Sequence, residues 1–175
     1  MAEDREMWER ICHGDAGAFD ALYRAHGPKL EVFLRRLLGN RQAAEDVMQE
    51  TFVGIWQRRN GFQPDRGTLR AYLFGAARKR AADWWRRHAA SPGSVMNEAA
   101  CWDSDMSPLI VDAIEQLTVE EGALIWLREV EGYSYEELAE VFEVPVGTVA
   151  SRLFTAREEL RRIWHASPHA KKEDS

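Results

Sequence analysis

The apolar residues of this chain recur almost throughout at the spacing of one face of an α-helix. No segment alternates apolar and polar residues as a half-buried strand does, so the pattern predicts an all-α protein. Proline suits the first turn of a helix, and Gly27-Pro28 is therefore expected to separate two helices. The predicted helices cover residues 4–12, 16–26, 28–38, 41–59, 68–88, 109–116, 118–130, 134–142 and 147–164.

One segment near the middle of the chain has no sustained period. Residues 89–107 carry proline, glycine and several serines, a composition that is typical of linkers. We therefore expect two small helical domains joined by a flexible linker. The predicted boundaries are 1–90 for the first domain, 91–108 for the linker, 109–164 for the second domain and 165–175 for a frayed tail.

The composition sets broad limits on the class of protein. With 175 residues, 45% of them hydrophobic and 30% charged, the chain can form two small globular domains and does not have a disordered composition. No stretch approaches the roughly 20 apolar residues that span a bilayer, and the charged N-terminus does not have the pattern of a secretory signal. Cys12 and Cys101 form no CxxC pattern, which argues against a disulfide framework or a zinc module. We expect a cytoplasmic protein.

The net charge of −6 is distributed unevenly along the chain. Residues 1–90 carry a net charge of +4, whereas residues 109–164 carry −7. Overall acidity usually counts against nucleic-acid binding. Local clusters of cations still attract phosphate, and a larger partner can supply most of the affinity. Nucleic acid therefore stays among the candidate ligands.

The helix predicted at residues 41–59 has two unlike faces. One face is apolar and is expected to lie against a core, with Val47, Met48, Phe52, Ile55 and Trp56. The other face consists of carboxylates, amides and one apolar residue, namely Asp46, Gln49, Glu50, Val53 and Gln57. This second face is either plain solvated surface or a docking surface, and the helix alone does not decide between the two.

Residues 132–153 have the pattern of a helix-turn-helix. Ser134 followed by Glu137 is a capping box for a short helix, and the small Ala139 lets two helices approach closely. After a turn, Thr148 is expected to cap the next helix. The predicted buried stripe of that second helix contains Val149, Leu153, Ala156, Leu160 and Ile163.

The outward side of this second helix carries hydroxyls and arginines. A recognition helix in a major groove meets base edges near its N-terminal end, and arginines further along reach phosphates. The predicted base contacts are Thr148, Ser151, Arg152 and Thr155, and the predicted phosphate contacts are Arg157, Arg161 and Arg162. The alternative is an ordinary helical hairpin with a solvated basic end.

Residues 68–88 form the most cationic stretch of the chain and are rich in aromatic side chains. The clustered cations are Arg78, Lys79, Arg80, Arg86 and Arg87, and the aromatic residues are Tyr72, Phe74, Trp84 and Trp85. Cations that hold a backbone while aromatic faces stack on bases are typical of proteins that bind single-stranded nucleic acid. Two alternatives stay open. Some of these side chains, including one of the two tryptophans, belong to the core, or the helix lies on a membrane surface.

Three features in this order resemble the bacterial sigma-70 family, specifically its small extracytoplasmic-function sigma factors. They are the helix with Ala44-Glu-Asp-Val-Met-Gln-Glu-Thr-Phe52, the basic aromatic helix, and the helix-turn-helix with Gly132-Tyr-Ser-Tyr-Glu-Glu-Leu-Ala and Val144-Pro-Val-Gly-Thr-Val-Ala-Ser-Arg-Leu153. The match runs from Ala18 to Arg162. The combination is highly specific, although no single piece is.

The resemblance implies a sigma factor, which performs no catalysis of its own and gives core RNA polymerase its choice of promoter. Asp46, Gln49, Glu50 and Val53 would dock on the clamp helices of the polymerase β′ subunit. The helix-turn-helix would read the −35 element and touch the β flap, while the linker would thread toward the active-site channel. The −10 element would be read and opened by the loop 60–67 and by Tyr72, Arg78, Lys79, Arg80, Asp83, Trp84, Arg86 and Arg87.

The resemblance also implies which partners to expect. They are core RNA polymerase, promoter DNA as duplex and as melted single strand, and an anti-sigma factor. No membrane, cofactor, metal ion or small-molecule substrate is expected.

Three positions depart from the family pattern. Ala150 stands where many relatives carry lysine, Lys79 where asparagine is frequent, and Tyr72 where tryptophan is common. These departures leave the class intact and bear on promoter sequence and strength. The acidic second domain further implies weak DNA affinity outside the holoenzyme.

Two other functions compete with this one. A stand-alone duplex-binding regulator would use only the helix-turn-helix and would leave the face with Asp46, Gln49 and Glu50 unexplained. A helical enzyme would need a constellation of reactive groups. The five histidines are scattered, and no Gly-rich phosphate loop, metal-ligand spacing or nucleophile motif occurs. We therefore predict that the chain is not an enzyme.

Overall fold

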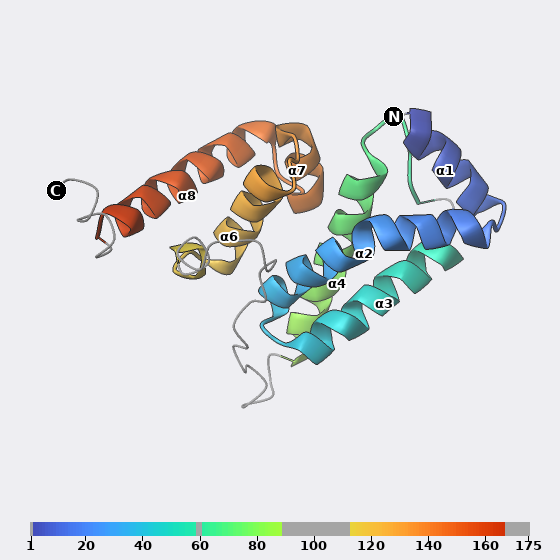
Figure 1. Ribbon diagram of the computed structural model, residues 1–175, viewed down its shortest axis with the longest axis horizontal. Coiled ribbons are helices and arrows are strands. Elements are labelled where there is room, and N and C mark those ends of the chain that lie inside the picture. The colour runs from blue at the N-terminus through green and yellow to red at the C-terminus, as the bar shows by residue number, and fades with distance from the viewer. Residues whose placement is uncertain (1, 59–60, 89–112, 167–175) are drawn as a thin grey trace. The chain divides into compact units, whose positions relative to one another are not determined.

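The structure is a computed structural model that describes residues 2–58, 61–88 and 113–166. These residues form helices joined by turns and loops and contain no strand, which confirms the predicted all-α class. They belong to two compact units, one built on helices α1 to α4 and the other on α6 to α8 (Figure 1). The predicted linker and most of the predicted tail lie outside the described residues, so the domain boundaries stay predictions.

Capping residues in the sequence set the helix boundaries of the first unit. Asp15 begins α2, because its carboxylate accepts hydrogen bonds from the amides of Gly17 and Ala18 at 2.8 and 3.1 Å. Asn40 begins α3 in the same way, and Gly39 ends α2 with a φ of 62°, in the left-handed region that favours glycine. The helices are α1 (Ala2–Cys12), α2 (Ala16–Leu38), α3 (Arg41–Gln57) and α4 (Leu69–His88).

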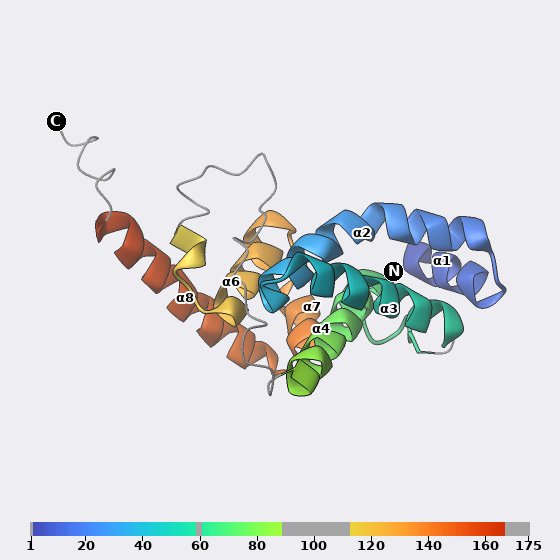
Figure 2. The same cartoon turned by 90° about the horizontal axis from the view of Figure 1, so that it is seen from below.

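Helix α2 is the centre of the first unit. It packs against α3 and α4, which also pack against each other, and α1 lies on its N-terminal part (Figures 1 and 2). Full burial of one large apolar side chain contributes about 1.5–3 kcal/mol, so this core determines which faces of α3 and α4 are turned outward. Its almost fully buried members include Leu22, Leu30, Phe33, Leu34, Ile55, Leu73 and Phe74.

The predicted break at Gly27-Pro28 is wrong, because α2 continues through both residues. A proline inside a helix removes one backbone hydrogen bond and costs about 3 kcal/mol. Leu22 before the proline and Leu30 after it are both fully buried, and Gly27 is buried as well. The burial of apolar residues on both sides of the proline outweighs its local cost.

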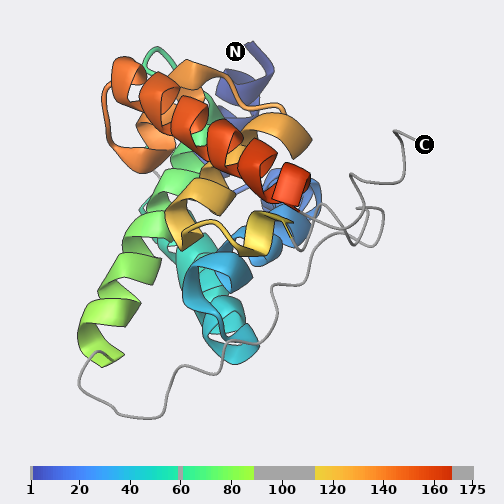
Figure 3. The same cartoon turned by 90° about the vertical axis from the view of Figure 1, so that its left-hand side faces the viewer.

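The predicted capping box at Ser134 and Glu137 is confirmed. The Ser134 amide donates to the Glu137 carboxylate at 2.9 Å, and the Glu137 amide donates to the Ser134 hydroxyl at 3.1 Å. One helical turn at residues 113–115 falls within the helix predicted at 109–116. Helix α8 packs on α6 (Figure 3). The elements are α6 (Val119–Ile125), the π-helical turn η1 (Trp126–Val130), α7 (Tyr135–Phe142) and α8 (Val146–Ala166).

The single α-helix predicted at 118–130 is wrong in its second half. The α-helical part ends at Ile125, and the chain continues in a π-helical turn, in which the Glu131 amide donates to the Trp126 carbonyl at 3.2 Å. Trp126 and Leu127 are adjacent and both buried. The buried apolar segment that begins at Ala123 in α6 thus continues into this turn.

Helix α8 begins two residues earlier than the predicted cap. Its first residue is Val146, so Thr148 lies in the first turn, where its amide donates to the Pro145 carbonyl at 2.8 Å. The predicted buried stripe is confirmed, except that Leu160 is half-buried. The fully or almost fully buried members are Val149, Leu153, Ala156 and Ile163.

Candidate functional site

The outward face of α3 is formed as the sequence predicts. Asp46, Gln49, Glu50 and Val53 are all exposed, and 51% of Val53 is accessible to solvent. The opposite face contributes to the core, with Trp56 half-buried at its edge. Carboxylates and an amide around one exposed apolar side chain are suited to a protein partner that carries basic and apolar groups.

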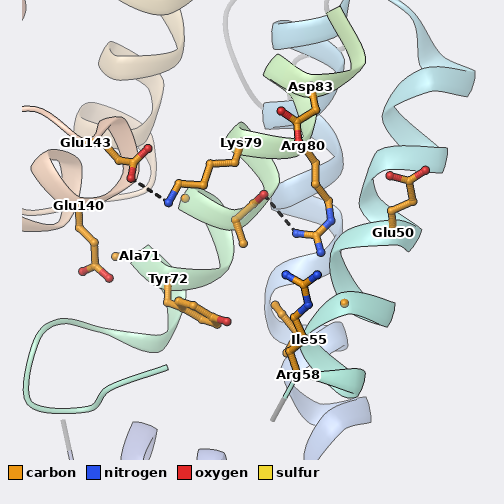
Figure 4. A pocket seen from close by; sticks show the side chains of 13 residues that line it. Glu50, Ile55, Arg58, Ala71, Tyr72, Lys79, Arg80, Asp83, Glu140 and Glu143 are labelled. Carbon is orange, nitrogen blue, oxygen red and sulfur yellow. Dashed lines mark hydrogen bonds and ion pairs between the residues drawn. The ribbon is translucent and has the colours of Figure 1, made fainter. Parts of the chain in front are cut away.

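Four of the residues predicted on α4 share one side of the helix. This side borders Glu50 of α3 and Arg58, the residue after α3, so the structure brings the two predicted surfaces of the first unit next to each other (Figure 4). Arg78 is half-buried, whereas Arg86 and Arg87 are exposed in the last turn of the helix. The four residues on the shared side are Tyr72, Lys79, Arg80 and Asp83.

Gly54 of α3 makes room for Arg80. Arg80 Nη1 donates to the Ala76 carbonyl at 3.4 Å, and the guanidinium lies so close to Gly54 that a Cβ at this position would overlap it. The Arg58 side chain points toward the same place from the end of α3 (Figure 4). Two guanidinium groups that face each other are suited to a phosphate. Arg58 was not among the predicted site residues. The one signal in the sequence was Gly54, a glycine inside a helix, which marks the place where the two side chains meet.

The Tyr72 hydroxyl lies beside these cations. Burial raises the pKa of Tyr72 above its usual value, although the charges of Arg80 and Arg58 act in the opposite direction. The phenol therefore stays protonated at neutral pH and can donate a hydrogen bond to a base or a phosphate.

The two adjacent tryptophans of α4 have different surroundings. Trp85 Nε1 donates to the Leu37 carbonyl at 3.0 Å, so this side chain ties the end of α4 to the end of α2. Trp84 stacks on His88, with the ring centroids 4.3 Å apart. Trp85 thus belongs to the fold, as expected for one of the pair, and the half-buried Trp84 is the candidate for stacking on a base.

The outward side of α8 carries the predicted base contacts. Ser151, Arg152 and Thr155 are exposed, and Thr148 is half-buried. The hydroxyls of Ser151 and Thr155 donate to the carbonyls of Thr148 and Ser151 at 3.0 and 3.1 Å. Phe154 stands among them with 66% of its surface exposed. Phe154 was not among the predicted contacts, although its place off the buried stripe was a visible signal in the sequence. Such a ring can contact a thymine methyl group.

Carboxylates of the second unit hold the arginines of α8. Arg152 pairs with Glu120 of α6 at 3.5 Å, and Arg157 pairs with Glu129 of η1 at 2.5 Å. Hydrogen bonds to Glu129 and to the Tyr135 hydroxyl raise the pKa of Arg157. A phosphate that approaches these arginines therefore meets side chains that already have anionic partners. Within α8 itself, Arg161 pairs with Glu158 and Arg162 with Glu159.

The part of the chain that the structure describes contains neither a candidate metal site nor a membrane-spanning helix. In these ranges no group of three or more His, Cys, Asp or Glu residues is placed to hold a metal ion. No helix among the same residues has the length and the apolar composition needed to cross a membrane.

Comparison with known proteins decides the family. The family model described as Sigma-70 region 2 matches residues 22–91, and the one described as Sigma-70, region 4 matches residues 108–160. The chain belongs to the sigma-70 family. It is 29% identical to the RNA polymerase sigma-H factor of Pseudomonas aeruginosa, over 90% of this chain and 92% of that protein. It is also 29% identical to the ECF RNA polymerase sigma-E factor of Haemophilus influenzae, over 90% of this chain and 95% of that protein.

A solved structure shares the fold of this sigma factor. The structure of CnrH in complex with the cytosolic domain of CnrY superposes with a TM-score of 0.69, at 26% sequence identity, and covers 94% of this chain and 98% of that chain. The predicted extracytoplasmic-function group is confirmed. This sigma factor binds core RNA polymerase and promoter DNA, directs promoter-specific transcription initiation, and has no enzymatic activity of its own.

Proposed function

We propose that this sigma factor binds core polymerase through α3 and promoter DNA through α4 and α8. The proposal rests on the division of α3 into two faces, one of which lies in the core. The other face exposes Asp46, Gln49, Glu50 and Val53. The resemblance to the family makes the clamp helices of the polymerase β′ subunit the partner for this face. The β flap is the corresponding partner for the second unit.

We assign recognition and opening of the −10 element to the domain at residues 1–90. The facing guanidinium groups of Arg58 and Arg80 support phosphate binding, and the half-buried Trp84, unlike Trp85, is the candidate for stacking on an unpaired base. Arg86 and Arg87, exposed at the end of α4, extend the cationic surface. The other proposed −10 contacts are Tyr72, Arg78, Lys79 and Asp83.

The −35 element belongs to the domain at residues 109–164, after the linker at 91–108 and before the tail at 165–175. Exposed Ser151, Arg152 and Thr155 support contacts with base edges, to which we add Phe154. Thr148 and Arg161 complete the proposed surface. The contacts of Arg157 with η1 and α7 favour a structural part for this residue over a phosphate contact.

We place the protein in the cytoplasm, together with the polymerase, under the control of an anti-sigma factor. Support for a protein inhibitor comes from CnrH, whose solved structure is a complex with the cytosolic domain of a second protein. The exposed face of α3, with Val53 at its centre, offers an inhibitor the same surface that the polymerase needs.

The test of the α3 surface is competition for core polymerase. The double variant Asp46→Ala with Glu50→Ala is expected to bind core enzyme at least about tenfold more weakly, equivalent to about 1.4 kcal/mol. The charge-matched control, Asp20→Ala with Glu9→Ala, removes two exposed carboxylates of α1 and α2 and should bind normally. Equal affinities of the two variants would reject the α3 surface.

The test of the whole proposal is transcription by purified components. Core polymerase with this chain should initiate at defined genomic start sites, and mapping those sites would reveal the −10 and −35 sequences. A stand-alone duplex-binding regulator would instead bind DNA without core polymerase and support no initiation. Absence of initiation, with no inhibitor present, would reject the proposed function.

A further inference from the structure

Helix α1 precedes the residues that the region 2 family model matches, and it contacts the loop that precedes α4. The region 2 match begins at residue 22, whereas α1 ends at Cys12. Three side chains of α1 reach residues 62–72, and each makes a different kind of contact. This loop is the segment next to the proposed −10 surface of α4.

The first contact is a cluster of three aromatic rings. The Trp8 ring lies 5.5 Å from that of Phe62 and 5.8 Å from that of Tyr72, and the latter two rings are 5.6 Å apart. Trp8 meets both rings edge to face, which is a favourable geometry for aromatic pairs. Trp8 and Phe62 are each only 5% exposed. The cluster thus joins α1, the loop and α4 in one small core.

The second contact caps α4. The Asp4 carboxylate accepts a hydrogen bond from the amide of Leu69, the first residue of α4, at 3.3 Å. The Thr68 hydroxyl accepts from the Ala71 amide, also at 3.3 Å. The first amides of a helix have no partner within the helix, so Asp4 completes from α1 the cap that Thr68 begins. A carboxylate is also favoured by the positive end of the helix dipole.

The third contact is an ion pair with the middle of the loop. Arg5 Nη2 lies 2.5 Å from Asp65 Oδ1. Both side chains are largely exposed, so this pair contributes little to the stability of the fold. It does restrict where the loop lies relative to α1, which makes it a good position to change without unfolding the protein.

We propose that α1 is a brace for promoter opening. Through Asp4, Arg5 and Trp8 it holds residues 61–68 and the first turn of α4 in the conformation that receives the melted strand. A loop that is already ordered loses less conformational freedom on binding, so the brace raises affinity for the strand. Tyr72 is both a member of the aromatic cluster and a proposed strand contact, which connects the brace directly to the binding surface. The inference rests on the proposed −10 function of α4.

The test measures binding of a labelled single-stranded oligonucleotide to holoenzyme by fluorescence anisotropy. The oligonucleotide carries the non-template −10 sequence of a promoter mapped with the wild-type protein. Asp4→Ala should weaken strand binding about three- to tenfold, because the first turn of α4 loses this cap and is held less firmly in the binding conformation. Asp4→Asn keeps an acceptor oxygen and should restore binding to nearly the wild-type value.

The ion pair allows a second test by charge exchange. Arg5→Glu and Asp65→Arg should each weaken strand binding by a smaller factor, and the double exchange should restore it. Affinity for core polymerase and the thermal unfolding temperature should stay at wild-type values in all three proteins. Trp8→Phe, which keeps a ring in the cluster, should bind the strand more weakly than wild type and more tightly than Trp8→Ala.

Three results would overturn the brace. Wild-type strand affinity in folded Asp4→Ala and Arg5→Glu holoenzymes would reject it. A parallel loss of core binding and thermal stability in Arg5→Glu and Asp65→Arg would show that the contacts of α1 only stabilise the fold, which also rejects it. Failure of the wild-type holoenzyme to bind the oligonucleotide would reject the proposed −10 function itself, on which the brace depends.

Discussion

Helices α4 and α8 both present arginines, but their surroundings differ. Helix α4 contains six Lys or Arg residues and one Asp, whereas α8 contains four Arg and two Glu. All four arginines of α8 contact a carboxylate of their own unit, and two of these carboxylates, Glu120 and Glu129, come from other elements. On α4, Arg86 pairs with Asp83, but Arg80 faces the guanidinium of Arg58 (Figure 4).

The difference suggests how the two units divide the work on a promoter. DNA that binds α8 must replace protein carboxylates with phosphates, so the net gain from each arginine is reduced. Glu50 and Asp83 line the surface around Arg58 and Arg80, but within the described residues neither of these arginines forms an ion pair, so they attract phosphate more directly. We expect the first unit to supply most of the electrostatic attraction, and the second to supply selectivity once polymerase holds both near the DNA.

The largest effect is expected on the aromatic part of α4. Trp84→Ala should weaken binding of the single-stranded −10 oligonucleotide to holoenzyme by about 1–3 kcal/mol, because one stacked base loses its partner. The matched control is Trp85→Phe, which loses the hydrogen bond to the Leu37 carbonyl. It should lower the free energy of unfolding by about 1 kcal/mol and leave strand binding unchanged. Equal losses of strand affinity in both variants would remove the distinction between the two tryptophans.

A comparable but more local effect is expected on α8. Arg152→Ala should cost about 1–3 kcal/mol at one base pair of the −35 element, if the side chain reaches a base edge. The measurement is holoenzyme binding to a panel of duplexes, each with one altered base pair. A loss spread evenly over all duplexes would instead identify Arg152 as a phosphate contact, and α8 would then resemble α4 more than we propose.

The structural role assigned to Arg157 predicts a smaller effect, which is a loss of folding stability. Arg157→Ala should lower the free energy of unfolding of the second unit by up to about 1 kcal/mol, because a partly exposed ion pair with Glu129 is lost. Thermal unfolding followed by circular dichroism would measure the change. The control is Arg161→Ala, whose ion pair lies within α8. Weaker binding of the −35 element at unchanged stability would instead identify Arg157 as a DNA contact.

The smallest effect tests the compensating carboxylates themselves. Glu120→Gln removes the anionic partner of Arg152 and should tighten duplex binding by about 0.2–1 kcal/mol at low salt. The gain should shrink as the salt concentration rises. Glu115→Gln, which removes the same charge outside α6 and α8, is the control. An equal gain in both variants would point to net charge rather than to the pair with Arg152.

Local signals predicted most of the fold correctly. The division of α3 into a buried and an exposed face follows from spacing along one helix, and the capping box at Ser134 and Glu137 needs only residues three apart. The break predicted at Gly27-Pro28 failed where packing outweighs local preference, because the core carries α2 through Pro28. No local signal marked the π-helical turn after Ile125 or the start of α8 at Val146.

The candidate site was predictable only where it depends on a single helix. The exposed positions of α3 and α8 follow from periodicity, whereas the partners of their charged groups come from elements distant in sequence. The residues around Arg157 do not predict its contact with Glu129, which lies 28 residues earlier. The residues around Arg80 likewise do not predict that Gly54 and Arg58 lie beside it. Trp8 and Phe62, which hold the loop before α4, are likewise 54 residues apart and carry no shared motif.

Gly54 and Arg80 have a consequence for how such a chain can evolve. A methyl group at position 54 would overlap the guanidinium where it now lies, so the end of the Arg80 side chain would have to move away from α3. We expect the fold to tolerate a substitution of Gly54 and the cation at position 80 to change its place. A lineage can then alter its promoter preference through a residue of α3, the helix proposed to dock on the polymerase, while Arg80 itself stays unchanged.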